Sequence, residues 1–145
     1  MANQVTTAWK QLWLGDTGIT GPTLPACDGS ATITIALIDT ADDTVAPNTD
    51  QDLADITGAA IVASGALTGV TVVPSGANVI LDANDKTLSA VSGDSAEHIV
   101  IYNATGVAAT SLLMIHYDTF TSGMPVTPNG GDIVIGMHAS GVAQI

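Results

Sequence analysis

Side chains capable of chemistry are few in this sequence, and most of them are aspartates. The 145 residues include fourteen acidic groups, two lysines, three histidines and one cysteine, and no arginine. A catalytic or phosphate-binding site needs several complementary groups, such as a nucleophile with its base or a cation facing an anion. The composition therefore leaves few combinations that could form an active site.

The three histidines give one hypothesis, a small metal-dependent hydrolase. His98, His116 and His138 each lie within a predicted strand, and His116 shares a strand face with Asp118. A zinc site needs three or four converging ligands, and no histidine here belongs to a spaced motif such as His-x-His or His-Glu-x-x-His. The alternative is that lone strand histidines bond to neighbours or face solvent. We expect no metal site and no cofactor.

Two acidic segments, 39–43 and 82–85, cluster oxygen atoms of the kind that bind calcium. Neither contains the Asp/Asn series, the glycine and the bidentate glutamate of an EF-hand loop. Aspartates in turns commonly bond to nearby backbone N–H groups. We therefore expect solvated acidic turns, with a calcium-binding module as the rival interpretation.

The sequence offers even fewer of the residues that other kinds of catalytic site need. Ser64 and Ser92 each precede a glycine but lack a Gly-x-Ser-x-Gly elbow, and Cys27 has no basic neighbour to activate its thiol. Aspartates are abundant enough for a glycosidase pair, but sugar sites normally also offer stacking aromatics, which make up only 3% of this chain. We expect no enzymatic activity, and a carbohydrate-binding module stays a second rival.

The net charge of −12 points to a protein as the partner. It repels phosphate backbones and anionic lipid, so we expect neither nucleic-acid nor membrane binding. No apolar run reaches the length of a membrane span, no signal peptide is recognisable, and lone Cys27 fits synthesis in a reducing cytosol. High mean hydropathy, +0.41, combined with few charges suggests that another subunit covers part of the surface.

Apolar, β-branched runs separated by turn residues predict an all-β fold. In the segment 31–39, Ile33, Ile35 and Leu37 alternate with Thr32, Thr34 and Ala36. We expect one domain, residues 1–145, with an N-terminal helix within residues 1–15 and a β-domain over residues 31–145. Its architecture is predicted to be an antiparallel β-sandwich or jelly roll of about eight or nine strands. The predicted strands are 31–39, 60–63, 69–73, 78–82, 87–90, 96–102, 112–119, 131–137 and 142–145, with an exposed acidic excursion over 40–52.

The segment Ala2–Leu14 is the only clear helix candidate. Val5, Trp9, Leu12 and Trp13 mark one apolar stripe, Asn3 can cap the helix and Gly15 can end it. Tryptophan is enriched at interface hot spots, so this stripe is a candidate subunit or partner interface. The alternative is that the helix covers one end of its own β-domain.

The segments 67–72, 78–85, 87–93, 96–105, 112–118 and 131–135 follow one another in an order and pattern that resembles small virion proteins of tailed bacteriophages. This likeness covers most of the chain. Its most distinctive run is Ile-Val-Ile-Tyr-Asn-Ala-Thr-Gly, residues 99–106. A short helix ending in Leu-x-Gly is similar to residues 9–15, a strand like residues 33–38 follows, and the close on Ser-Gly-Val-x-x-Ile is matched at residues 140–145.

The resemblance implies a capsid cement or decoration protein of jelly-roll-like fold. Such a protein sits as a dimer or trimer on the outside of the phage head and bridges major capsid subunits. Its expected partners are the major capsid protein and copies of itself, and its expected location is the virion, after synthesis in the host cytoplasm. The alternative within the virion is a tail, baseplate or head-fibre protein with adhesive function.

Overall fold

A computed structural model describes residues 4–13, 31–75, 78–118, 123–139 and 141–144. Within these ranges the chain forms ten short strands, one α-helix and three single turns of 3₁₀ helix, and every strand pair is antiparallel. The expected all-β fold is thus confirmed, while a jelly-roll connectivity stays a prediction. No helix in the described ranges is long and apolar enough to cross a membrane.

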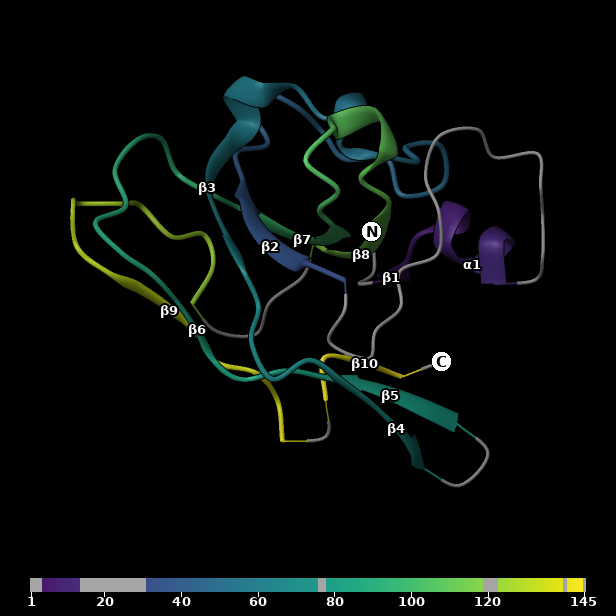
Figure 1. Ribbon diagram of the computed structural model, residues 1–145. Helices are drawn as coiled ribbons and strands as arrows, with labels where there is room; N and C mark the ends of the chain where they lie inside the picture. The colour runs from purple at the N-terminus through teal and green to yellow at the C-terminus, as the bar shows by residue number, and fades with distance from the viewer. Residues whose placement is uncertain (1–3, 14–30, 76–77, 119–122, 140, 145) are drawn as a thin grey trace.

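The largest sheet has five strands in the order β1-β8-β7-β2-β3 (Figure 1). All six residues of β2 are buried, because both faces of this sheet are covered by other parts of the chain. Side chains that alternate along this strand therefore point into two different cores, one on each face of the sheet, and none of them faces solvent. The strands are β1 (Gln4–Val5), β2 (Ile33–Ile38), β3 (Ile61–Ala66), β7 (His98–Asn103) and β8 (Leu113–Tyr117).

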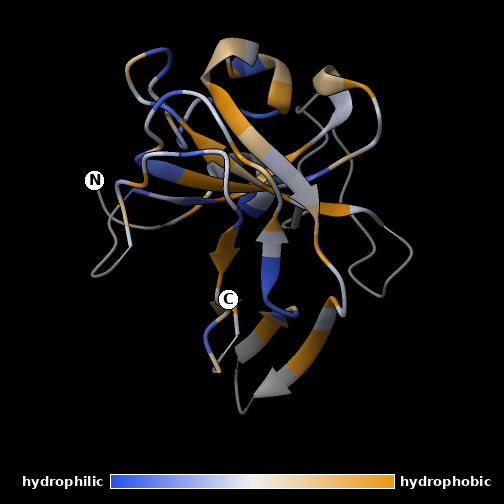
Figure 2. Ribbon diagram, turned by 90° about the vertical axis from the view of Figure 1, so that its left-hand side faces the viewer, coloured by the Kyte–Doolittle hydropathy of each residue, from blue (hydrophilic) through white to orange (hydrophobic). Residues whose placement is uncertain are grey.

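One face of this sheet packs against two smaller sheets. Ile33, Ile35 and Leu37 of β2 share a core there with Leu81 and Leu88. Figure 2 shows the hairpin of β4 and β5 projecting below the rest of the molecule. The smaller sheets are β10-β5-β4 and β6-β9, formed by β4 (Thr71–Ser75), β5 (Asn78–Asp82), β6 (Lys86–Leu88), β9 (Ile133–Ile135) and β10 (Ala143–Gln144).

The opposite face is covered by the segment between β2 and β3, where Val45 and Ile56 pack on Ala36 and Ile38. The expectation of an exposed excursion over 40–52 is therefore wrong in part, since Val45 is only 1% exposed. Backbone hydrogen bonds fasten this segment to the start of β8, for example from Leu113 N to the Gln51 carbonyl (3.0 Å). The 3₁₀ turns are η1 (Leu53–Asp55), η2 (Gly58–Ala60) and η3 (Ala108–Thr110).

Helix α1 (Thr7–Trp13) begins later than the predicted helix Ala2–Leu14. Gln4 and Val5 instead form β1, which pairs with β8. Thr6 follows this strand and caps the helix, because its hydroxyl accepts a hydrogen bond from Trp9 N (3.3 Å). The predicted boundary residues Asn3 and Gly15 lie outside the described residues.

Candidate functional site

His98 and His116 are brought together by the pairing of β7 and β8. Val100 lies opposite His116, so the two histidines are diagonal neighbours on one face of the sheet. His116 Nε2 lies 3.1 Å from His98 Nδ1, and the ring planes meet at 66°. The pair is thus a hydrogen-bonded contact between two adjacent strands.

Burial keeps both imidazoles neutral at pH 7. His116 is fully buried, and desolvation together with the nearby His98 lowers the pKa of His116 to about 4. Desolvation also lowers the pKa of His98, although the carboxylates of Asp118 and Glu97 oppose this shift. His116 Nδ1 has no hydrogen-bond partner among the described residues. A pair that stays neutral in this way is poorly suited to acid–base catalysis near neutral pH.

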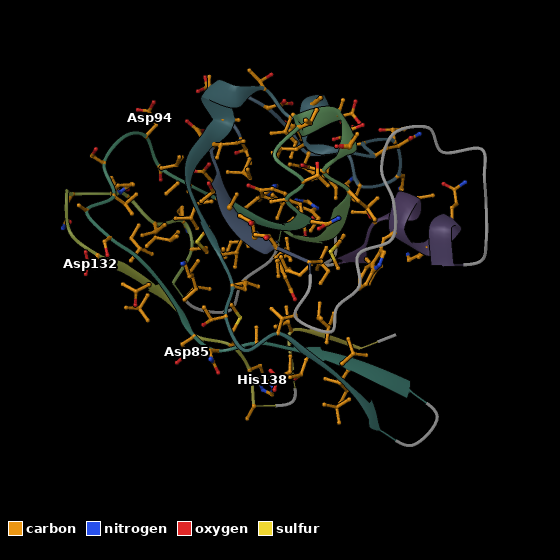
Figure 3. The ribbon with its side chains drawn as sticks, viewed as in Figure 1. Asp85, Asp94, Asp132 and His138 are labelled. Carbon is orange, nitrogen blue, oxygen red and sulfur yellow. The ribbon has the colours of Figure 1, made fainter. Side chains whose placement is uncertain are left out.

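His138 does not join this pair. It lies on the segment after β9, at the lower side of the view in Figure 3, and the expectation that it lies in a strand is wrong. Strand β9 ends at Ile135, because only three residues pair with β6. In the described part of the chain, no third acidic, histidine or cysteine ligand stands with His98 and His116 in metal-binding geometry.

Three carboxylates do converge, at Asp39, Asp42 and Asp94, whose oxygens lie within 4.8 Å of one another. The sequence indicated the segment 39–43 but not Asp94, which comes from the loop before β7 (Figure 3). Asp39 Oδ1 already accepts a hydrogen bond from Ala41 N (2.8 Å), and Asp42 and Asp94 are exposed. Clusters of exposed acids are common without an ion, so this one assigns no calcium site.

Several other acids accept hydrogen bonds from backbone N–H groups, and at Asp82 this is the local turn contact that the sequence predicts for the segment 82–85. Asp52 and Asp55 form a capping box around η1. Asp50 accepts a hydrogen bond from Ala46 N (2.6 Å), and burial raises its pKa. Asp82 and Asp85 accept from Ala83 N (2.9 Å) and Met137 N (2.7 Å), so they hold separate parts of the backbone.

An apolar cavity of about 170 Å³ lies between the large sheet and the segment after β9. Its polar side chains are Tyr117 and His138. The Tyr117 hydroxyl donates a hydrogen bond to the Val142 carbonyl, and burial raises the pKa of Tyr117 to about 12. This phenol therefore fastens the C-terminal segment to β8 and is not poised to ionise. The other lining residues are Ile35, Ile99, Ile101, Ile135, Gly136, Met137, Gly141 and Val142.

Of the four residues in the predicted interface stripe, Val5 and Trp9 pack in or against the core, and the side chains of the other two are not described. Trp9 is only 4% exposed and belongs to the core beneath β2, with Val5 half-buried against it. Trp9 thus packs on its own β-domain, as in the alternative interpretation in which the helix covers one end of that domain. The side chains of Leu12 and Trp13, like Cys27, lie outside what the structure describes.

Exposed apolar side chains are found elsewhere. Val72 and Val73 of β4 are 45% and 49% exposed. Val107 before η3 and Val134 of β9 are also exposed. The sequence identified the strands at β4 and β9, but not that these valines would remain uncovered within the chain.

A scan of the chain against models of protein families gave no match, and a search of curated proteins gave none either.

Proposed function

We propose that this protein is a non-enzymatic structural component of a tailed-phage particle, a cement or decoration protein on the outside of the head. It stabilises contacts between major capsid subunits and associates with copies of itself. The virion assignment rests on the sequence resemblance described above. The contact role is supported by the uncovered hairpin of β4 and β5.

The hairpin is the single observation that carries the contact role. Successive strand residues point to opposite faces, so Val72 and Val73 leave both faces of β4 partly uncovered. Asp82, at the end of β5, is the only charged residue in the two strands. Beyond the two residues of β10 that pair with Ile80 and Leu81, the hairpin is a two-stranded ribbon, and such a ribbon is only marginally stable in water by itself. A neighbouring subunit that covers it would stabilise the hairpin and gain adhesion at the same time.

The charged groups support the same proposal through their local roles. Asp50 and Asp52 cap turns, and the two strand histidines are neutral and bonded to each other. Ligands that bind only the assembled state shift the equilibrium toward it. A protein that contacts two capsid subunits therefore stabilises the shell without any chemical step.

Purified particles test the proposal directly. Densitometry should find this chain at a copy number comparable to that of the major capsid protein. A few copies per particle would instead favour the tail, baseplate or head-fibre alternative, which the same hairpin would suit. Absence from mature particles would overturn the virion assignment.

The hairpin itself can be tested with a double variant, Val72→Thr and Val73→Thr. Threonine keeps the β-branched shape that strands favour but reduces apolar surface. We expect severalfold lower occupancy on heads that lack the protein, with an unchanged free energy of unfolding. Val107→Thr is the matched control, since Val107 is 60% exposed on a different part of the molecule. Equal occupancy by the wild type, the double variant and the control would show that the hairpin does not contact the capsid.

A further inference from the structure

Strand β3 is the free edge of the five-stranded sheet, since it pairs only with β2. Leu67 N donates to the Ile33 carbonyl (2.7 Å), in register with the pairs formed by β3. Directly opposed residues of an antiparallel pair alternate between hydrogen-bonded and unbonded. Counting back from Leu67, Gly65 and Ala63 bond toward β2, and the backbone N–H and C=O groups of Ser64 and Ala66 point outward.

The outward groups have no partner in the described part of the chain. No hydrogen bond between described residues uses the N–H or C=O of Ser64 or Ala66. Both residues are exposed. An unpaired row of this kind is a template for an added strand.

Two other edge strands, β4 and β1, are protected in ways that β3 is not. Pro74 lies on the edge strand β4 and removes a backbone donor, and β1 has only two residues. Strand β3 contains neither proline nor a charged residue, and its single irregularity is at its start, opposite Leu37 and Ile38. The run from Ala63 to Ala66 is therefore regular and available for pairing.

A groove of about 440 Å³ lies along part of this edge, beside Val62, Ala63 and Ser64. One wall is the first half of β3, and the other is the segment that begins with β6. Gly65 allows the walls to approach, because a Cβ there would lie 2.5 Å from Lys86 Cε and 2.9 Å from Leu88 Cδ2. The lining residues are Val62, Ala63, Ser64, Lys86, Thr87, Leu88, Ser89, Ala90, Val91 and Ser92.

The charge of the groove is opposite to that of the molecule. Its lining includes Lys86 and no carboxylate, in a chain of net charge −12. The acids that flank β6 and β9 in the sequence, Asp85 and Asp132, accept hydrogen bonds from Met137 N and Ala90 N (Figure 3). Asp94 follows the last lining residue, Ser92, by two positions and belongs to the cluster with Asp39 and Asp42. A ligand carboxylate would thus meet an ammonium group here and carboxylates over much of the remaining surface.

We propose that this groove binds one extended segment of another protein chain, added as a strand to β3, with a carboxylate facing Lys86. Backbone hydrogen bonds to Ser64 and Ala66 supply affinity, and Lys86 supplies selectivity. A lone segment fits better than a second copy of β3, because the copy would bring its own β6 wall into the same space. That the segment belongs to a neighbouring virion subunit rests on the proposed function.

Peptide libraries test the groove without reference to virions. The probe is a library of amidated pentapeptides of Val, Thr, Ser and Ala with one Asp at a random position, matched by a library with Asn instead. Immobilised wild-type protein should retain the Asp library better. The preference should fall about fivefold in Lys86→Met, which keeps the aliphatic stem, since an exposed charge pair contributes up to about that factor. Lys10→Met, with the same change in net charge at an exposed helical site, should retain the preference.

A backbone variant tests the added strand. Ser64→Pro removes the outward N–H but leaves the bonds to β2, and Ser64→Ala is its control because it keeps that N–H. Retention of the library should be lost in the first variant and kept in the second. No preference for the Asp library, or equal retention by Lys86→Met and wild type, would overturn the proposal even if Ser64→Pro fails to fold.

Hydrogen exchange on intact heads separates this proposal from the proposed function. The segment 61–67 should gain protection when the protein binds heads. Binding without that protection would leave the cement role intact and exclude the groove as its attachment surface. Failure to bind heads, with the peptide preference intact, would reject the cement role and retain the groove.

Discussion

At the scale of single residues, the His98–His116 contact makes the fold sensitive to acid. The folded state lowers the pKa of His116 to about 4 from 6.5, and that of His98 in the same direction. Between those values the unfolded chain binds more protons than the folded one, so the free energy of unfolding falls as the pH is lowered from 6.5 toward 4. Asp118 reduces the shift at both histidines, and Glu97 reduces it at His98. For His116 the full loss is on the order of 3 kcal/mol.

Denaturation in urea at pH 7.0, 5.5 and 4.5 measures this slope. His116→Leu should flatten it, because an aliphatic side chain cannot titrate. Glu97, whose pKa is lowered by hydrogen bonds from Thr40, contributes only at the acid end, below its ordinary value of 4.5. A slope in His116→Leu equal to that of the wild type would mean that other groups cause the acid sensitivity.

At the scale of elements, helix α1 is held by a cap and one large side chain. The Thr6 hydroxyl accepts from Trp9 N and donates to the Leu113 carbonyl, and Trp9 fills the core beneath β2. We expect Trp9→Ala to lower the free energy of unfolding by about 3–5 kcal/mol, the usual cost of emptying such a site. Lys10→Ala, at an exposed neighbouring position, should change it by less than about 0.5 kcal/mol. Equal stability of the two variants would show that the helix is not anchored by Trp9.

Sequence patterns located elements whose signal is local. The alternation of Ile33, Ile35 and Leu37 predicts β2, and β5 has the predicted bounds Asn78–Asp82. Strand β1 was missed because its partner β8 is remote in the chain, and the helical stripe beginning at Val5 overlaps it. The cover formed by Val45 was missed because a single valine in an acidic stretch has no periodicity.

The candidate sites were harder to predict because they depend on register. Sequence placed His98 and His116 in strands, but their contact requires the pairing of β7 with β8, which shifts between Ile101 and Tyr102. To predict the groove, one must know which strand lies at the edge of the five-stranded sheet. The available signal was the absence of charge and proline from 61–66, which becomes informative only once β3 is known to be an edge.

At the scale of the whole molecule, the negative charge of each copy opposes self-association, and exposed apolar side chains favour it. Each copy carries −12, and the exposed Val72 and Val73 favour contact between copies. Salt screens exposed charges, with a Debye length of about 10 Å at 0.1 M and about 3 Å at 1 M. The predicted dimer or trimer should therefore become more stable as sodium chloride is raised from 0.05 to 0.5 M. Sedimentation velocity measures this directly, with the Val72→Thr, Val73→Thr variant expected to associate less at every salt concentration. An oligomer that dissociates as salt is added would instead be held by ion pairs, which Lys10 and Lys86 alone would have to supply.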